Sequence, residues 1–133
     1  MSTELAYGLK KTVTASVDET DARVRDALQR EGFGVLTEID VKATMKKKLD
    51  VDFRPYRILG ACNPPLAHRA LTEEIDIGLL LPCNVVVYAG DEEGTAVVAI
   101  LDPILQMGVA GSDDMLPMAQ DVRARMERVL AAI

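Results

Sequence analysis

The chain has 133 residues, the length of one ordinary domain, and its 49% hydrophobic and 27% charged residues are typical of a globular protein. The formal net charge of −6 repels polyanions, and an aromatic content of 4% without Trp leaves few platforms on which bases could stack. We therefore expect no nucleic-acid partner.

The sequence contains no run of about 20 apolar residues, the length that a membrane span requires. Residues 1–7 show no basic region followed by an apolar run, so no signal peptide is predicted. Two cysteines in an acidic chain of this kind are expected to be free thiols. We expect a soluble, cytoplasmic protein with a single domain over residues 1–133 and no membrane partner.

The first third of the chain predicts a strand, a helix and a second strand. Tyr7–Ala15 alternates apolar and polar residues and is predicted as a strand. A helix follows, with Asp18 as its N-cap and Gly32 at its C-terminal end. Phe33–Ile39 is rich in apolar and β-branched residues and is the second predicted strand. The buried stripe of the helix is predicted from helical spacing at Val24, Ala27 and Leu28.

A second helix is predicted after Asp40, which can cap it, with Val41, Met45 and Leu49 four residues apart on its inner face. A basic cluster overlaps this helix. It is either a solvated helix end, where positive charge complements the helix dipole, or a patch that binds anions. Its members are Lys42, Lys46, Lys47, Lys48, Arg54 and Arg57.

A third strand and a third helix meet at a cysteine. Tyr56–Cys62 is predicted as the strand, and Asn63 followed by Pro64 matches an N-cap with proline at the first helical position. This helix is expected to run to about Glu74. Its inward residues are predicted to be Ala67, Ala70 and Leu71.

The last third of the chain predicts a hairpin and a helix. Cys83–Ala89 and Thr95–Leu101 are strands joined by a glycine-flanked turn. A final helix begins near Asp113 or Asp114. The order β-α-β-α-β-α-β-β-α favours an α+β fold, with a mainly antiparallel sheet of about five strands and helices packed on one face. The final helix is predicted to bury Ala119, Val122, Met126, Val129 and Leu130.

Cys62 is the candidate with a physical reason to be reactive. It ends a strand directly before a helix N-terminus, where unpaired N–H groups and the dipole favour a thiolate. The alternative is structural, because free cysteine often packs as a small buried hydrophobe. His68, the single histidine, lies about five residues along the predicted helix, roughly 7.5 Å of rise, which makes a direct Cys62–His68 pair unfavourable.

The position of Cys83 depends on topology. In a parallel crossover, Cys62 would end one strand and Cys83 begin the other, on the order of 15–20 Å apart. Antiparallel pairing, or a dimer, would bring the two sulfurs together. Two cysteines and one histidine are one ligand short of a structural zinc site, so neither a metal nor a cofactor is expected.

Three segments of the chain resemble one known family. Tyr56–Leu71, Ile77–Tyr88 and the earlier Gly32–Asp40 are similar to the signature of domain-of-unknown-function family 302. The similarity covers most of the chain and is strongest from about residue 32 to residue 102. It implies a TATA-binding-protein-like α+β fold with a curved antiparallel sheet, and association as a homodimer. Likeness to that fold does not imply DNA binding, against which the acidic charge also argues.

The resemblance assigns no activity and no catalytic residue, but the two Cys-Asn steps belong to its pattern. Our leading hypothesis is a small polar or anionic ligand bound near the N-terminus of the third helix. One alternative is a thiol, sulfur-transfer or redox enzyme that uses Cys62, and another is a structural dimer without a ligand. The candidate ligand contacts are Cys62, Asn63, His68, Cys83 and Asn84.

Overall fold

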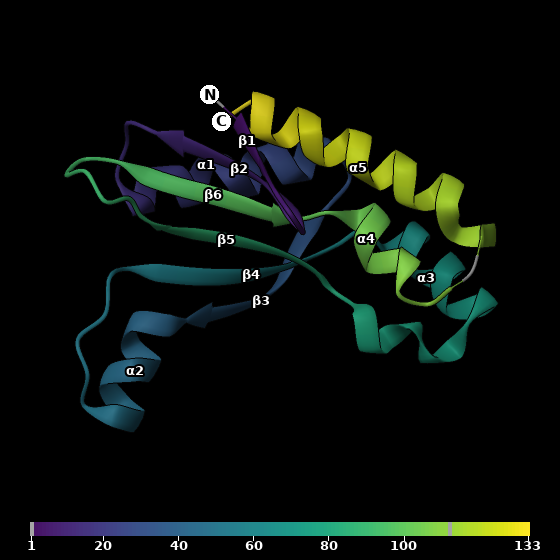
Figure 1. The fold of residues 1–133 in the computed structure, drawn as a ribbon, viewed down its shortest axis with the longest axis horizontal. Helices are drawn as coiled ribbons and strands as arrows, with labels where there is room; N and C mark the ends of the chain where they lie inside the picture. Colours follow the sequence, from purple (N-terminus) through teal and green to yellow (C-terminus); the bar gives the residue numbers. More distant parts are fainter. Residues whose placement is uncertain (1, 112) are drawn as a thin grey trace.

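Six strands form one antiparallel sheet in a computed structural model that describes residues 2–111 and 113–133 (Figure 1). Their order across the sheet is β1-β2-β6-β5-β4-β3, and each neighbouring pair runs antiparallel. The predicted antiparallel α+β fold is confirmed, with β1 added to the expected strands. The strands are β1 (Ser2–Leu5), β2 (Gly8–Val13), β3 (Gly34–Asp40), β4 (Tyr56–Cys62), β5 (Cys83–Ala89) and β6 (Ala96–Leu101).

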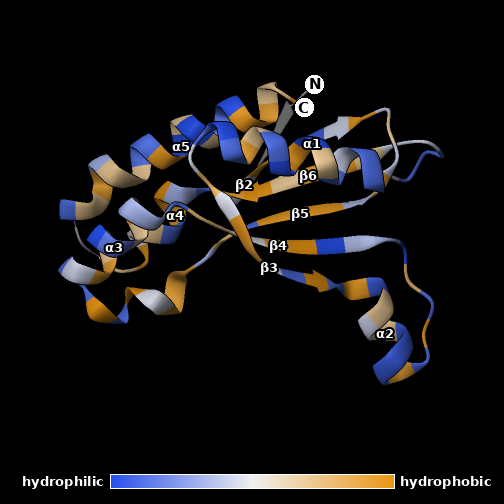
Figure 2. Cartoon of the chain, turned by 180° about the vertical axis from the view of Figure 1, so that it is seen from behind, coloured by the Kyte–Doolittle hydropathy of each residue, from blue (hydrophilic) through white to orange (hydrophobic). Residues whose placement is uncertain are grey.

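Two long helices, α1 (Val17–Arg30) and α5 (Leu116–Ala131), lie across one face of this sheet, as Figure 2 shows. Side chains alternate along each strand, so every second residue points toward these helices. The opposite face carries no helix across it within the described chain (Figure 1). The main core lies between the helices and the sheet and includes Val24, Leu28, Leu59, Val85, Val87, Val98, Ile100, Met126 and Val129.

A second, smaller core lies at the end of the sheet where β4 ends and β5 begins. Short elements surround it, and Ala70, Ile77, Met115 and Met118 are its buried residues. The amino-terminal part of α5 contributes to this core while its carboxy-terminal part packs on the sheet. The short elements are α3 (Pro64–Glu73), the 3₁₀ helix η1 (Ile75–Leu80), α4 (Pro103–Gly108) and the 3₁₀ turn η2 (Asp113–Met115).

Helix α2 (Val41–Leu49) projects beyond the sheet at the end away from α3 and α4 (Figure 1). Asp40 caps it as predicted, because its Oδ1 accepts a hydrogen bond of 2.9 Å from the Ala43 N–H. The predicted burial of Val41, Met45 and Leu49 is wrong: no residue of α2 is buried, and Leu49 is 65% exposed. The helix connects edge strand β3 to β4, and Val41 and Met45 on its apolar face are only partly buried.

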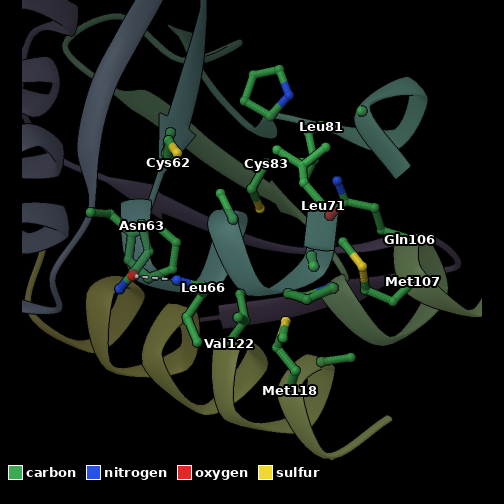
Figure 3. Close-up of a pocket in the computed structure, with 18 of the residues that line it drawn as sticks. Cys62, Asn63, Leu66, Leu71, Leu81, Cys83, Gln106, Met107, Met118 and Val122 are labelled. Carbon is green, nitrogen blue, oxygen red and sulfur yellow. Dashed lines mark hydrogen bonds between the residues drawn. The ribbon is translucent and has the colours of Figure 1, made fainter. Parts of the chain in front are cut away.

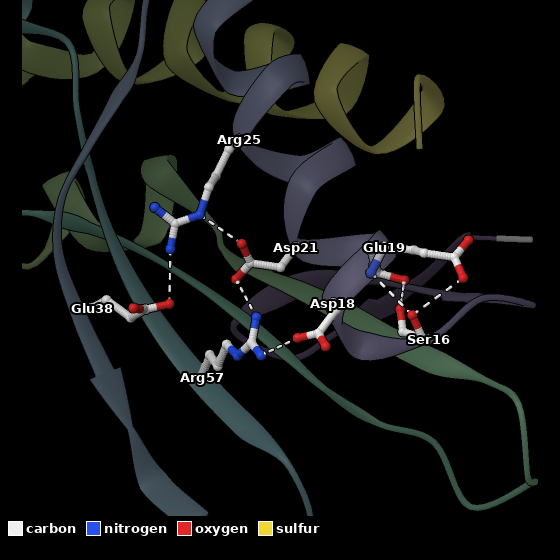
Figure 4. Close-up of polar contacts among 8 residues, drawn as sticks. Ser16, Asp18, Glu19, Asp21, Arg25, Glu38 and Arg57 are labelled. Carbon is white, nitrogen blue, oxygen red and sulfur yellow. Dashed lines mark hydrogen bonds and ion pairs between the residues drawn. The ribbon is translucent and has the colours of Figure 1, made fainter.

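The predicted N-cap of α1 is also wrong, because the helix begins one residue before Asp18 (Figure 4). Ser16 caps the helix, since its hydroxyl accepts a hydrogen bond of 3.1 Å from the Glu19 N–H. Asp18 instead forms an ion pair with Arg57 of β4, whose other guanidinium nitrogen lies 3.2 Å from buried Asp21. Carboxylates of α1 thus engage the end of the predicted basic cluster.

Other members of that basic cluster are paired as well. Lys46 lies 2.9 Å from Asp50, one turn away, and Arg54 lies 3.0 Å from Asp91. These pairs favour a solvated helix end over an anion-binding patch. No helix among the described residues is long and apolar enough to cross a membrane.

Candidate functional site

A cavity of about 360 Å³ lies where the main core meets the second core (Figure 3). Ala61, Cys62 and Cys83 line it from the sheet, and α3, α4 and α5 close it from the other sides. Its volume falls within the roughly 300–1,000 Å³ of small-molecule sites. The residues that the helices contribute include Leu66, Ala67, Ala70, Gln106, Met107, Met118, Ala119 and Val122.

Small side chains keep this cavity open. Four of its lining residues, Ala61, Ala67, Ala70 and Ala119, end at Cβ, and Gly78 adds no side chain. Protein interiors are otherwise packed like organic crystals, with few voids larger than a water molecule. The cavity is therefore a specific property of this sequence at the junction of the two cores.

Asn63 lines the pocket and caps α3 as predicted. The cap, however, occupies the backbone N–H groups that would otherwise bind an anion. Its side-chain Oδ1 accepts a hydrogen bond of 3.2 Å from the Leu66 N–H, and its backbone oxygen accepts one of 2.9 Å from the Ala67 N–H. Pro64 and Pro65 occupy the first two helical positions and have no N–H. From Pro64 to Ala67, no N–H remains free for an anionic ligand.

Cys62 lies half-buried at the end of β4 and lines the same pocket. Desolvation by burial raises the pKa of its thiol above the ordinary value. A reactive cysteine requires the opposite shift, toward the thiolate. The expected lowering of this pKa by the helix N-terminus is thus absent, which removes the physical reason for reactivity.

Cys83 lies beside Cys62 at the same end of the sheet, because β4 and β5 pair antiparallel with Ala61 opposite Cys83. The separation that a parallel crossover would impose is therefore avoided. Cys83 shares the face of Ala61 because the two residues lie opposite each other, and Cys62, the last residue of β4, lines the same pocket (Figure 3). Both thiols are free. Burial raises the pKa of Cys83 from 9.0 to about 12, so its thiol is neutral at physiological pH.

The structure does not bring the other two candidates to this pocket. His68 lies exposed on α3 and is not among the residues that line the cavity. Asn84 is exposed on the uncovered face of the sheet, where it borders a second cavity of about 280 Å³. Over residues 2–111 and 113–133, no group of three or more His, Cys, Asp or Glu side chains is arranged to hold a metal ion.

Helix α4 supplies lining residues that the sequence reasoning missed. Asp102 caps it by accepting a hydrogen bond of 2.9 Å from the Ile104 N–H, and it lies 2.5 Å from Arg123 of α5. This pair holds α4 against α5 at the pocket. The amide nitrogen of Gln106 then donates to the backbone carbonyl of Leu80, which ties α4 to η1. Asp102-Pro103 repeats the N-cap and proline pattern of Asn63-Pro64 and was the available signal.

Comparison with known proteins identifies a family and solved structures with a similar fold. Residues 9–133 match the family described as "Domain of unknown function DUF302". The fold is similar to the crystal structure of an uncharacterized conserved protein DUF302 from Bacillus stearothermophilus, with a TM-score of 0.86 and 32% sequence identity. The alignment covers 96% of this chain and 98% of that one. No curated protein matches the sequence significantly.

Proposed function

This chain belongs to the DUF302 family, whose description assigns no activity, and we propose that it binds a small molecule. The proposed site is the cavity at the N-terminal end of α3. The observation that carries this proposal is a cavity of about 360 Å³ with a mostly apolar lining at the junction of the two cores. Cys62, Asn63 and Cys83 are the proposed ligand contacts among the residues singled out from the sequence.

The reading of Cys62 as a catalytic thiol gains no support from its surroundings. Burial raises its pKa, and the single histidine lies outside the pocket. A thiol-transfer or redox enzyme would need a general base or a positive charge beside the sulfur. Binding without covalent chemistry is the simpler function for these residues.

The test is a substitution that reduces the volume of the cavity. Ala67 is half-buried and lines the pocket, so the longer side chain of Ala67→Leu can extend into the cavity. Ala43→Leu, on an exposed position of α2, makes the same change far from the cavity. Wild type and both variants would be purified in parallel and extracted with organic solvent, and the retained small molecules compared by mass spectrometry.

We expect wild type and Ala43→Leu to retain the same compound and Ala67→Leu to lose it. Unchanged circular dichroism and a melting temperature within a few degrees of wild type would show that Ala67→Leu is folded. Identical extracts from all three proteins, whether a compound is present or not, would contradict a ligand in this cavity.

We also propose that two copies of the chain pair through the uncovered face of the sheet. The chain has only five aromatic residues, three Tyr and two Phe. Three of them, Tyr7, Tyr56 and Tyr88, line the cavity on this face, and Phe53 packs on Tyr56 with ring centroids 6.1 Å apart. The rings of Tyr56 and Tyr88 stack at 5.1 Å. Aromatic residues are enriched at protein interfaces, which supports a partner on this face.

Sedimentation velocity tests the pairing. We expect wild type to sediment as a dimer at micromolar concentration and Tyr88→Glu to sediment as a monomer, because a carboxylate would be desolvated between the two sheets. Val109→Glu is the control, since Val109 is 71% exposed and lies outside the sheet. The dimer would be refuted if the wild-type protein remains monomeric up to roughly 100 μM.

A further inference from the structure

We propose that the ligand of this pocket is an uncharged aliphatic chain of medium length, held by its hydrocarbon body. This inference rests on the proposed binding function and names the chemical class of ligand. It differs from the polar or anionic ligand that the sequence suggested. The chemistry of the lining favours an apolar ligand over a polar or anionic one.

The lining contains no charged side chain that could pair with a charged ligand. None of the residues around the cavity is Asp, Glu, Lys, Arg or His. The side-chain oxygen of Asn63 accepts a hydrogen bond from the Leu66 N–H, and the amide nitrogen of Gln106 donates one to the Leu80 carbonyl, so each amide is engaged at one end within the protein. An anion placed here would lose its hydration without gaining a charged partner, which is costly in an apolar environment.

The walls are instead suited to hydrocarbon. Leu, Met, Ala, Val and Pro side chains form most of the lining, and Phe33 is its single aromatic member. Met107 and Met118 are unbranched and flexible, so they can adapt to a bound chain. A cavity whose walls are mostly apolar holds water poorly and favours an apolar occupant.

Exposure along the lining gives the pocket a direction. Leu36 of β3 is 68% exposed and Gly78 of η1 is exposed, whereas Ala70 and Met118 are buried. The mouth therefore lies beside β3 and η1, and the floor lies between α3 and α5. A chain would insert from the β3 side, with its polar end left in water at the mouth.

The experiment measures affinity against chain length. The neutral dye N-phenyl-1-naphthylamine would be displaced by n-alcohols from hexanol to dodecanol, on wild type, Ala67→Leu and Ala43→Leu. We expect affinity to rise roughly fourfold for each added methylene, as burial of a CH₂ predicts, until the chain fills the cavity. In Ala67→Leu the rise should stop at a shorter alcohol, and in Ala43→Leu it should match wild type.

The outcomes separate this inference from the binding function on which it rests. A flat series, or decanoate bound more tightly than decanol, would overturn the aliphatic ligand. If a polar compound is retained by wild type and lost from Ala67→Leu, the cavity is a binding site but its ligand class is wrong. If Ala67→Leu changes neither the retained compounds nor the alcohol series, both the ligand class and the binding function fail.

Discussion

Leu59→Ala is expected to lower the free energy of unfolding by about 2–5 kcal/mol, whereas Ile58→Ala, one residue earlier on β4, should cost about 1 kcal/mol in the monomer. Leu59 is fully buried between the sheet and the helices. Ile58 is half-buried and points to the face that no helix covers. The two substitutions therefore compare the two faces of a single strand.

The measurement is urea unfolding of the three proteins, followed by circular dichroism at two protein concentrations. At the lower concentration only Leu59→Ala should shift the midpoint strongly, with an unchanged slope. If the uncovered face pairs two copies, the loss caused by Ile58→Ala should grow with concentration, because association stabilises only the folded state. Equal losses at low concentration would mean that both faces of β4 are covered within one chain.

Local signals in the sequence were sufficient for several elements. The bounds predicted for β4 and β5 match the structure, and the caps at Asp40 and Asn63 form as expected. Each of these depends on residues that are neighbours in the chain. The DUF302 resemblance was likewise carried by contiguous runs, and the family match over residues 9–133 confirms it.

Two predictions were wrong, the burial of α2 and the N-cap of α1. Periodicity marks an apolar face on α2, but it cannot say how far the other elements cover that face, and no residue of α2 is buried. Ser16, not Asp18, caps α1, and the signal for it is local: Ser16 and Glu19 have the spacing of a capping box, and the Ser16 hydroxyl accepts a hydrogen bond from the Glu19 N–H. The pairing of Asp18 with Arg57, 39 residues away, is set by the fold and is not encoded locally.

The pocket lay between these two cases. Cys62 and Asn63, which the sequence singles out as candidate ligand contacts, line the pocket, while its floor needs α4 and α5 to fold back beside α3. Antiparallel pairing of β4 with β5 then brought Cys83 to Cys62. The cap also affects the ligand class, because the Asn63 side chain accepts a hydrogen bond from the Leu66 N–H and that N–H is then not available to an anion.

Alkaline pH should destabilise the wild-type protein through Cys83. Burial raises the pKa of its thiol from 9.0 to about 12, so the folded protein keeps this proton where the unfolded chain loses it. Stability from the neutral thiol is fully present below pH 9 and is lost as pH rises from 9 toward 12. Three pH units at about 1.36 kcal/mol each give a loss of roughly 4 kcal/mol.

The comparison that isolates this effect is the free energy of unfolding of wild type and Cys83→Ala between pH 8 and pH 11, under reducing conditions. All other titratable groups are common to both proteins, so their contributions cancel in the difference. The alanine variant should start less stable, because the substitution removes a buried sulfur, and then approach wild type as pH rises. Parallel curves would mean that Cys83 is not sealed from solvent, and a cavity wall open at that point would no longer suit an apolar ligand.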